Sequence, residues 1–496
     1  MRKIFFALIA IFGILVSCSK DFLNPQPTNA VSDEQIFSSV EAANTALNSA
    51  YAYIGHYYSM TLGTVMSEVM GEDASMSSGA YGFPTYNWNL YSYTYSQVAA
   101  SEPWWFGYSN YIWPTDYKGI DSVNSILANA EALEEGSDKK ELIAQAYAVR
   151  GFLYLRLIRM FAPTYTVNPE GKGVILRLET ANAASEHLKR ASIKDVYAQI
   201  VSDLTYAVNN CTGTSQYFIN SKAAALLLAR TYLDMADYAN AQKYAEMAAG
   251  NTFDGSNLCS KEEWRSGFKN PNSEWLWGFN YNENTSNFYA SLPSFYYLAD
   301  SDTAIEYGGQ SSVDGIFETG ENLLDGYSTV RWTKRFVDSF ENGDCRKLFP
   351  FYFFAADGYL TSKFSHRGTI GDADFPLARV AEAYLIKAEC EAKAGSASIA
   401  KQVLNALQEK RGASKTDGSL ENIYMERRKE LYGEGFRLHD IKRLHQPLDR
   451  TKDPEHWADV KSLPADSPRF MLPIPEVEML YNSALTSADQ NEFWAK

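Results

Sequence analysis

Between residues 221 and 249 the sequence carries the pattern of two short amphipathic helices joined by a tight turn. Small or apolar side chains recur at Ala224, Leu227, Leu228, Thr231 and Met235, and then at Ala241, Tyr244, Ala245 and Ala248. Spacings of three and four residues place each set on one helical face, and the alanines allow close approach. Such a pair is typical of a tetratricopeptide-type hairpin. Because one pair cannot bury its own apolar face, the pattern predicts a stack of several pairs.

Comparable patterns occur elsewhere, separated by long stretches without a helical period. We predict about four helix pairs, at about 141–208 (interrupted), 221–249, 379–411 and 421–443. Two segments, at about 56–112 and 251–376, are instead rich in turn-forming and aromatic residues, and loops of this length are usually functional. The sequence therefore predicts a mostly α fold, a tetratricopeptide-type helical-hairpin solenoid with long irregular loop inserts.

The N-terminus carries the features of an export signal. Arg2 and Lys3 are basic, and the thirteen residues from Ile4 to Val16 contain no charge. A helix of that length spans about 20 Å, less than the roughly 30 Å hydrocarbon core of a bilayer, so we predict a signal peptide at 1–17. Leu15-Val16-Ser17-Cys18 resembles the lipobox of bacterial lipoproteins, which implies a Cys18 acylated with chains such as palmitate and a polar tether at 18–35. The alternative is a secreted protein in which Cys18 is incidental.

Charge and motif content exclude several function classes. The formal net charge of −15 argues against nucleic acid as a partner, because phosphate binding needs a basic face. The chain contains no P-loop, G-x-G-x-x-G or H-E-x-x-H motif and no C-x-x-C pair. We therefore predict no metal and no cofactor. Beyond Cys18 the cysteines are expected to be mostly buried free thiols, although pairing stays open: Cys211, Cys259, Cys345 and Cys390.

Glu426, Glu430 and Glu434 recur every four residues near the C-terminus, with arginines among them. This spacing puts three carboxylates on one helical face. Paired carboxylates can act as general acid and base when they flank a cleft. The other interpretation is an ion-pair network that holds the last helix pair on the solenoid. We favour the network and predict no catalytic residues and no enzymatic activity.

An ordered set of motifs resembles the SusD/RagB family of outer-membrane nutrient-binding lipoproteins. The motifs are R-V-A-E-A-Y-L-I-K-A-E at 379–389, E-R-R-K-E-L at 426–431, E-G-F-R-L-H-D-I-K-R at 434–443, I-P-E-V-E at 474–478 and Q-N at 490–491. Ile441 departs from the family's usual Leu, and the usual Pro-Gly does not follow Asn491. Because the resemblance extends over nearly the whole mature chain, residues 36–496 are predicted to form a single SusD-like body.

The resemblance also implies a location and a partner. Family members are lipid-anchored at the cell outer membrane, facing the exterior, and pair with a TonB-dependent transporter of the SusC/RagA type. Their usual cargo is glycan, as in starch or other polysaccharide utilization, although some relatives handle peptides. The irregular excursions from the helical scaffold are then expected to carry the ligand site, without catalysis.

Aromatic residues gather in the two inserts. Residues 81–117 hold 14 Phe, Tyr or Trp in 37 positions, and residues 275–297 hold nine in 23. A flat ring suits the C–H face of a pyranose, while polar side chains suit its hydroxyl rim. We predict that some subset of five rings forms an exposed stacking surface: Trp88, Tyr91, Trp104, Trp105 and Tyr296. The alternative is that these rings form small cores within the inserts. Trp113 is assigned a structural role, and Trp275 and Trp277 are expected to be half buried.

Together these observations predict a cell-surface lipoprotein that binds glycan or oligosaccharide and delivers it to a TonB-dependent transporter. Two alternatives stay open. One is a lipid-anchored, peptide-binding helical-repeat protein of the same uptake type, and the other is a helical glycoside hydrolase.

Overall fold

The computed structural model describes residues 33–56, 59–77, 91, 108–181, 187–286, 288–296, 326–349, 351–353 and 358–495. Its longer helices are α3 (Val40–Ile54), α4 (Thr61–Val69), α7 (Tyr108–Asn129), α8 (Ser137–Phe161), α9 (Ile193–Asn210), α10 (Ser221–Asp234), α11 (Tyr238–Ala248), α17 (Val380–Lys393), α18 (Ala397–Arg411), α19 (Leu420–Leu431) and α20 (Arg437–Arg443). Its short helices include α2 (Asp33–Ile36), α12 (Lys261–Arg265), α13 (Leu292–Tyr296), α16 (Lys334–Asp338) and α21 (Glu476–Tyr481).

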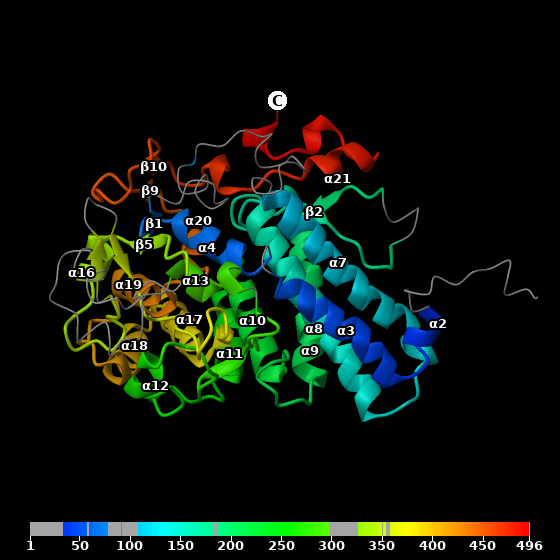
Figure 1. The fold of residues 1–496 in the computed structure, drawn as a ribbon, viewed down its shortest axis with the longest axis horizontal. Helices are drawn as coiled ribbons and strands as arrows, with labels where there is room; N and C mark the ends of the chain where they lie inside the picture. Colours follow the sequence, from blue (N-terminus) through cyan, green and yellow to red (C-terminus); the bar gives the residue numbers. More distant parts are fainter. Residues whose placement is uncertain are drawn as a thin grey trace, which may run out of the picture.

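The long helices pack in pairs, α8 with α9, α10 with α11 and α17 with α18. The pairs stack through α9 on α10 and α11 on α17, and α19 packs on α17 (Figure 1). The predicted mostly α, helical-hairpin fold is therefore confirmed. A further pair, α3 with α7, was not predicted because the first insert separates its two helices in the sequence.

Helix α4 lies inside the first insert, which was expected to lack a helical period. Leu62, Val65, Met66 and Val69 do follow the helical spacing of three and four residues, so that expectation was wrong here. All nine residues of α4 are buried, the polar ones included.

Local sequence determines where the helices begin and how closely they approach. The Asn220 side chain accepts a hydrogen bond from the backbone N–H of Ala223 at 3.0 Å, which caps the start of α10. Asp237 caps α11 in the same way. Between α8 and α9, a Cβ on Gly151 would lie 2.8 Å from Leu204 Cγ. This helix pair therefore needs a glycine at its closest approach.

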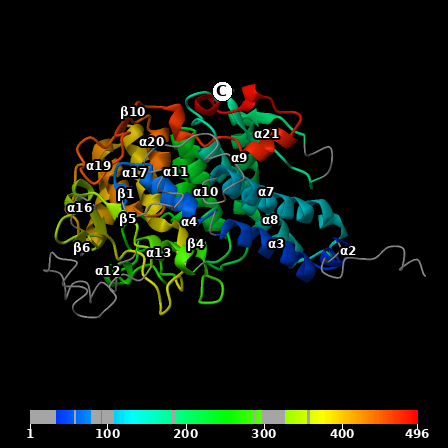
Figure 2. The same ribbon diagram turned by 45° about the horizontal axis from the view of Figure 1, so that its top comes forward.

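Short antiparallel strands connect the inserts to the helices. One sheet has the order β1 (Ala74–Met76), β5 (Val330–Trp332), β7 (Gly358–Leu360) and β6 (Phe351–Phe353). Separate pairs are β4 (Trp275–Phe279) with β8 (Phe375–Arg379), β2 (Lys172–Ile175) with β3 (Arg190–Ser192), and β9 (Leu448–Asp449) with β10 (Ser462–Leu463). Strand β8 runs directly into α17, so the β4–β8 pair anchors the second insert on the solenoid (Figure 2).

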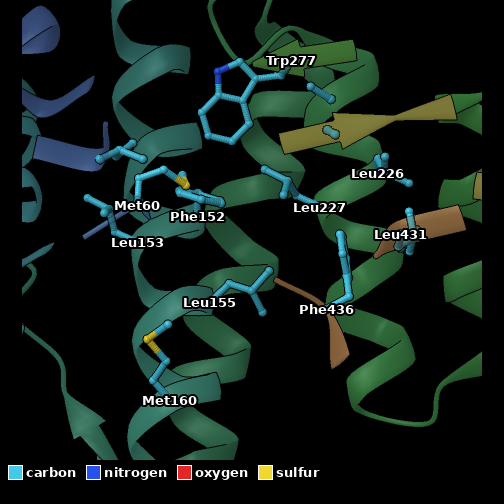
Figure 3. Close-up of a cluster of buried hydrophobic side chains, with 14 of the residues drawn as sticks. Met60, Phe152, Leu153, Leu155, Met160, Leu226, Leu227, Trp277, Leu431 and Phe436 are labelled. Atoms are coloured by element: carbon cyan, nitrogen blue, oxygen red, sulfur yellow. The ribbon is translucent and has the colours of Figure 1, made fainter. Parts of the chain in front are cut away.

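The hydrophobic core extends through the described chain, and Figure 3 shows the part of it where Phe152 and Leu153 of α8 and Leu226 and Leu227 of α10 lie near Trp277 of β4. Trp277 is fully buried and packs edge-on against Phe152, with ring centroids 4.8 Å apart. Trp275 is 2% exposed. The expectation that both tryptophans are half buried was wrong, because Trp277 packs against Phe152 of α8 and Trp275 packs against Phe268. Trp113 is buried, in agreement with its structural assignment.

The four cysteines Cys211, Cys259, Cys345 and Cys390 are buried free thiols, as predicted. Burial raises the pKa of Cys345 to about 11 and that of Cys211 to about 12, so these thiols stay protonated at neutral pH. Within the part of the chain that the structure describes, no helix combines the length and the apolar character needed to cross a membrane.

Candidate functional site

The predicted stacking residues fall into two groups. Tyr91 and Tyr296 are each 0% exposed, so the expectation that either ring faces solvent was wrong. Trp88, Trp104 and Trp105 lie outside the described residues, as does Cys18. Their roles in glycan stacking and in lipidation therefore stay predictions.

Tyr91 is buried because it bridges two distant parts of the chain. Its hydroxyl donates to the carbonyl oxygen of Met70 at 2.7 Å, and its ring centroid lies 6.4 Å from that of Phe470. The guanidinium of Arg450 lies 5.1 Å from the same ring. Burial raises the pKa of the Tyr91 hydroxyl above its usual value.

Tyr296 is buried because α13 packs inward against the sheet. Its ring centroid lies 5.1 Å from that of Trp332, on β5, and 5.5 Å from that of Phe364. Its hydroxyl has no hydrogen-bond partner among the described residues. Tyr296 therefore belongs to the small core of the second insert, which is the alternative that the sequence left open.

Three other rings of the second insert face solvent and contact one another. Phe288, Tyr289 and Tyr327 are 47%, 44% and 44% exposed. The Phe288 and Tyr289 centroids are 4.5 Å apart with the rings nearly perpendicular, and the Tyr289 and Tyr327 centroids are 5.7 Å apart. We call these three residues the aromatic patch. It presents ring faces in more than one orientation, which suits a non-planar sugar chain better than a single flat surface would.

The patch is held by the backbone around it. The side-chain oxygen of Ser294, on α13, accepts a hydrogen bond from the backbone N–H of Tyr327 at 3.0 Å. The backbone carbonyl oxygen of Ser294 accepts a second one from the N–H of Ser328 at 2.6 Å. Gly371 has a φ of +86°, and a Cβ there would lie 3.0 Å from Phe288 Cα. The loop that contains Gly371 can therefore approach Phe288 only with a glycine at this position.

Polar side chains occur on the turn that precedes Phe288 and on the loop whose Gly371 contacts Phe288. Asn280 and Asn282 are exposed, although Asn282 Oδ1 already accepts the N–H groups of its own turn. Arg367, on the Gly371 loop, donates from Nε to Asp372 at 2.8 Å and from Nη1 to Asn270 at 3.0 Å. Ring faces beside amide, carboxylate and guanidinium groups are the combination that carbohydrate recognition requires.

The aromatic patch was only partly visible in the sequence. Phe288 and Tyr289 lie in the second aromatic cluster, but so do the buried Trp277 and Tyr296. Tyr327 lies outside both clusters. The one local signal is the run of Asn, Thr and Ser before Phe288, which is typical of an exposed turn.

The charged C-terminal motif forms a buried ion-pair network, as favoured from its spacing. Glu430 accepts hydrogen bonds from Arg379 at 2.9 Å, from Arg411 at 3.0 Å and from Arg346 at 3.1 Å. Glu434 lies beyond the end of α19, between two glycines with positive φ, so the expectation that all three carboxylates share one helical face was wrong. It still joins the network by accepting hydrogen bonds from Arg379 and Lys363, both at 2.7 Å. These side chains are 0–4% exposed.

The arginines adjacent to the motif point elsewhere. Arg427 pairs with Asp440 and Arg428 with Asp73. Successive helical residues are 100° apart around the axis, so these arginines leave α19 on other faces. The network is instead completed by residues far away in the sequence.

Electrostatics and burial give these carboxylates a structural role. Burial alone would raise the pKa of Glu430, but Arg411, Arg379 and Arg346 hold it well below its usual value. Burial lowers the pKa of Lys363 to about 8. A glycosidase needs carboxylates that flank an open cleft, whereas Glu426, Glu430 and Glu434 are enclosed and already bonded to cations. Within the described residues, no group of three His, Cys, Asp or Glu is arranged to hold a metal ion.

Comparison with known proteins agrees with this architecture. A family model of SusD-like proteins, described as starch-binding and associating with the outer membrane, matches residues 21–233. The SusD family model matches residues 352–494. A SusD-like protein P2 of Formosa agariphila is 24% identical over 51% of this chain, and the match spans only about half, 47%, of that relative. A second relative, SusD-like protein P25 of the same species, is 23% identical over 76% of this chain and 78% of its own length.

Solved structures share the fold over almost the whole chain. A SusD-like carbohydrate-binding protein of Bacteroides vulgatus superposes with a TM-score of 0.73 at 25% identity, over 92% of this chain and 100% of its own. Surface glycan-binding protein A of Bacteroides thetaiotaomicron superposes with a TM-score of 0.68 at 14% identity, over 92% and 99%, which shows the fold alone. The two family models together cover well over half of the chain, and the chain therefore belongs to the SusD/RagB family.

Proposed function

We propose that this protein is a cell-surface lipoprotein that binds glycan and delivers it to a TonB-dependent transporter of the SusC/RagA type. The observation that carries the binding part is the aromatic patch, in which Phe288, Tyr289 and Tyr327 are exposed and in mutual contact. Exposed aromatic side chains cost free energy in water, and grouped ones mark a binding surface. Rings beside amide, carboxylate and guanidinium groups favour a sugar over a purely apolar ligand.

The scaffold supports this role by holding the patch without taking part in binding. The network around Glu430 joins α19 to Arg379 at the end of β8 and to Arg411 at the end of α18. Glu274, directly before β4, accepts hydrogen bonds from both Arg379 and Arg411, so the strand that leads to Phe288 and Tyr289 is attached to the same buried network. A preformed surface binds more tightly than a flexible one, because less conformational entropy is lost.

The location and the partner are part of the same proposal. The lipobox-like segment ending at Cys18 supports attachment to the outer membrane, with the protein facing the cell exterior. Two or more acyl chains suffice for stable anchoring. Membership of the SusD/RagB family supports a SusC/RagA-like partner, and co-purification with a large outer-membrane barrel protein tests it.

Incubation of the purified protein with a glycan panel tests the proposed function. The panel contains starch oligosaccharides, since the matching family model is described as starch-binding, together with other neutral and acidic polysaccharides. Retention without new reducing ends is the expected result. New reducing ends would indicate a hydrolase, and binding of peptides alone would indicate the peptide-carrying alternative.

A further inference from the structure

Helix α21 lies beside the first turns of α7 in both ribbon views (Figures 1 and 2). These two helices, together with Arg177, Glu179, Ala181 and His187, enclose a groove of about 510 Å³. Small-molecule sites commonly have volumes of about 300–1,000 Å³. The groove shares no residue with the aromatic patch, so it offers a second place for a ligand.

The floor of the groove is rigid because its aromatic side chains are tied to the walls. The indole N–H of Trp113 donates to Glu478 Oε2 at 3.1 Å, and Arg177 Nη2 donates to Glu478 Oε1 at 2.9 Å. The Arg177 guanidinium lies 4.8 Å from the ring centroid of Tyr117, whose hydroxyl donates to the carbonyl oxygen of Ile175 at 2.6 Å. Glu478 thus joins α21 to α7 and to the segment that follows β2.

The wall formed by the segment after β2 is held by polar side chains of α7. Asn124 Nδ2 donates to the carbonyl oxygens of Arg177 and Glu179, both at 3.0 Å. Asp121 Oδ1 accepts the backbone N–H of Ala181 at 2.7 Å. The groove is therefore preformed, and a ligand would not have to order its walls.

The opening of the groove is apolar and faces solvent. Tyr481 is 77% exposed and Val477 is 45% exposed, and both line the groove. Leu480, next to Tyr481, is 72% exposed. Three large exposed side chains on one six-residue helix form a surface that is suited to contact with a ligand.

The charges around the groove argue against an anionic ligand. Arg177 is already paired with Glu478, and His187 accepts the backbone N–H of Ser483 on Nδ1. The remaining charged groups are Lys118 and two carboxylates, those of Asp121 and Glu179, so an anion is disfavoured. Hydrogen-bond donors and acceptors stand beside aromatic rings, which matches the hydroxyl rim and the C–H face of a sugar.

We propose that this groove is a second saccharide site, which takes one or two neutral sugar units with a pyranose stacked on Tyr481. The class of ligand rests on the proposed function, whereas the groove itself is independent of the patch. Two separate sites on one rigid scaffold would raise the apparent affinity for a long glycan that reaches both.

The test starts from the double variant Tyr289→Ala/Tyr327→Ala, so that the groove remains while the patch is removed. The neutral probes are maltoheptaose, cellohexaose and mannohexaose, and hexagalacturonate is the charged comparison. Isothermal titration and saturation-transfer NMR measure binding. We expect the double variant to retain weak binding of at least one neutral probe but not of hexagalacturonate. Adding Tyr481→Ala should weaken the retained binding about tenfold or more.

Tyr206→Ala is the matched control, because Tyr206 is an exposed tyrosine outside the groove, 37% exposed and packed on Tyr147. An unchanged melting temperature in each variant excludes loss of fold. If the wild type binds a probe and the double variant binds none, the groove proposal is overturned while the proposed function stands. The same holds if Tyr481→Ala leaves the residual binding unchanged. If no neutral probe binds even to the wild type, both proposals fail.

Discussion

Replacing Glu430 with glutamine tests whether the buried network holds the second insert on the solenoid. Glu430 is fully buried and accepts hydrogen bonds from three guanidinium groups, those of Arg346, Arg379 and Arg411. The indole N–H of Trp264 also donates to it, at 3.3 Å. Glutamine keeps the size of the side chain but removes its charge, and it turns an amide N–H₂ donor towards groups that are themselves donors.

The expected cost is large because the remaining cations stay buried. Removing one partner of a buried ion pair costs about 3–5 kcal/mol, and we expect a loss of about 4 kcal/mol in the free energy of unfolding for Glu430→Gln. Urea denaturation at neutral pH, followed by tryptophan fluorescence, measures this loss. Asp338→Asn is the control, because the ion pair between Asp338 and Lys334 is exposed. This substitution should leave the free energy of unfolding unchanged within the error of the assay. A Glu430→Gln variant within about 1 kcal/mol of the wild type would refute the structural role of the network.

Three further predictions concern other parts of the chain. Burial raises the pKa of Glu68 to about 7, so the folded state binds a proton that the unfolded state releases, and stability should fall as pH rises from about 4.5 to 7. Glu68→Gln should remove this pH dependence and raise the free energy of unfolding above pH 7 by up to about 3 kcal/mol. Urea unfolding of both proteins across this pH range measures the effect, and an equal pH dependence in wild type and variant would contradict it. Tyr91→Phe should cost about 1–2 kcal/mol, because it leaves the Met70 carbonyl unpaired, whereas Tyr296→Phe should cost nothing in the same denaturation assay; equal costs would be evidence against these assignments. Cys18→Ala should move the protein from the membrane fraction to the soluble fraction, and unchanged fractionation would disprove lipidation.

The helical pairs could be predicted because their signal is local. Ala224, Leu227 and Leu228 recur on one face, and the structure buries all three completely. Glu426 and Glu430 could be placed on one face of α19 for the same reason, since a spacing of four residues aligns them, whereas Glu434 lies in the turn beyond the helix. Their partners could not, because Arg346, Arg379 and Arg411 reach Glu430 from three separate segments.

The exposure of individual rings could not be predicted from the sequence. Tyr289 and Tyr296 lie seven positions apart in the same cluster, yet one is 44% exposed and the other fully buried. The difference comes from Trp332 and Phe364, which cover Tyr296 from distant parts of the chain. Tertiary contacts of this kind leave no periodic signal in a segment whose regular elements are as short as the five-residue α13.

In the proposed function, the exposed rings of the aromatic patch bind carbohydrate and the helical scaffold positions them. Isothermal titration of the wild type and of Tyr289→Ala/Tyr327→Ala, with the glycan that the panel retains best, separates these two roles. We predict that the double variant loses at least about tenfold in affinity at an unchanged unfolding midpoint. Unchanged affinity, or a parallel loss of affinity and stability, would contradict this proposal.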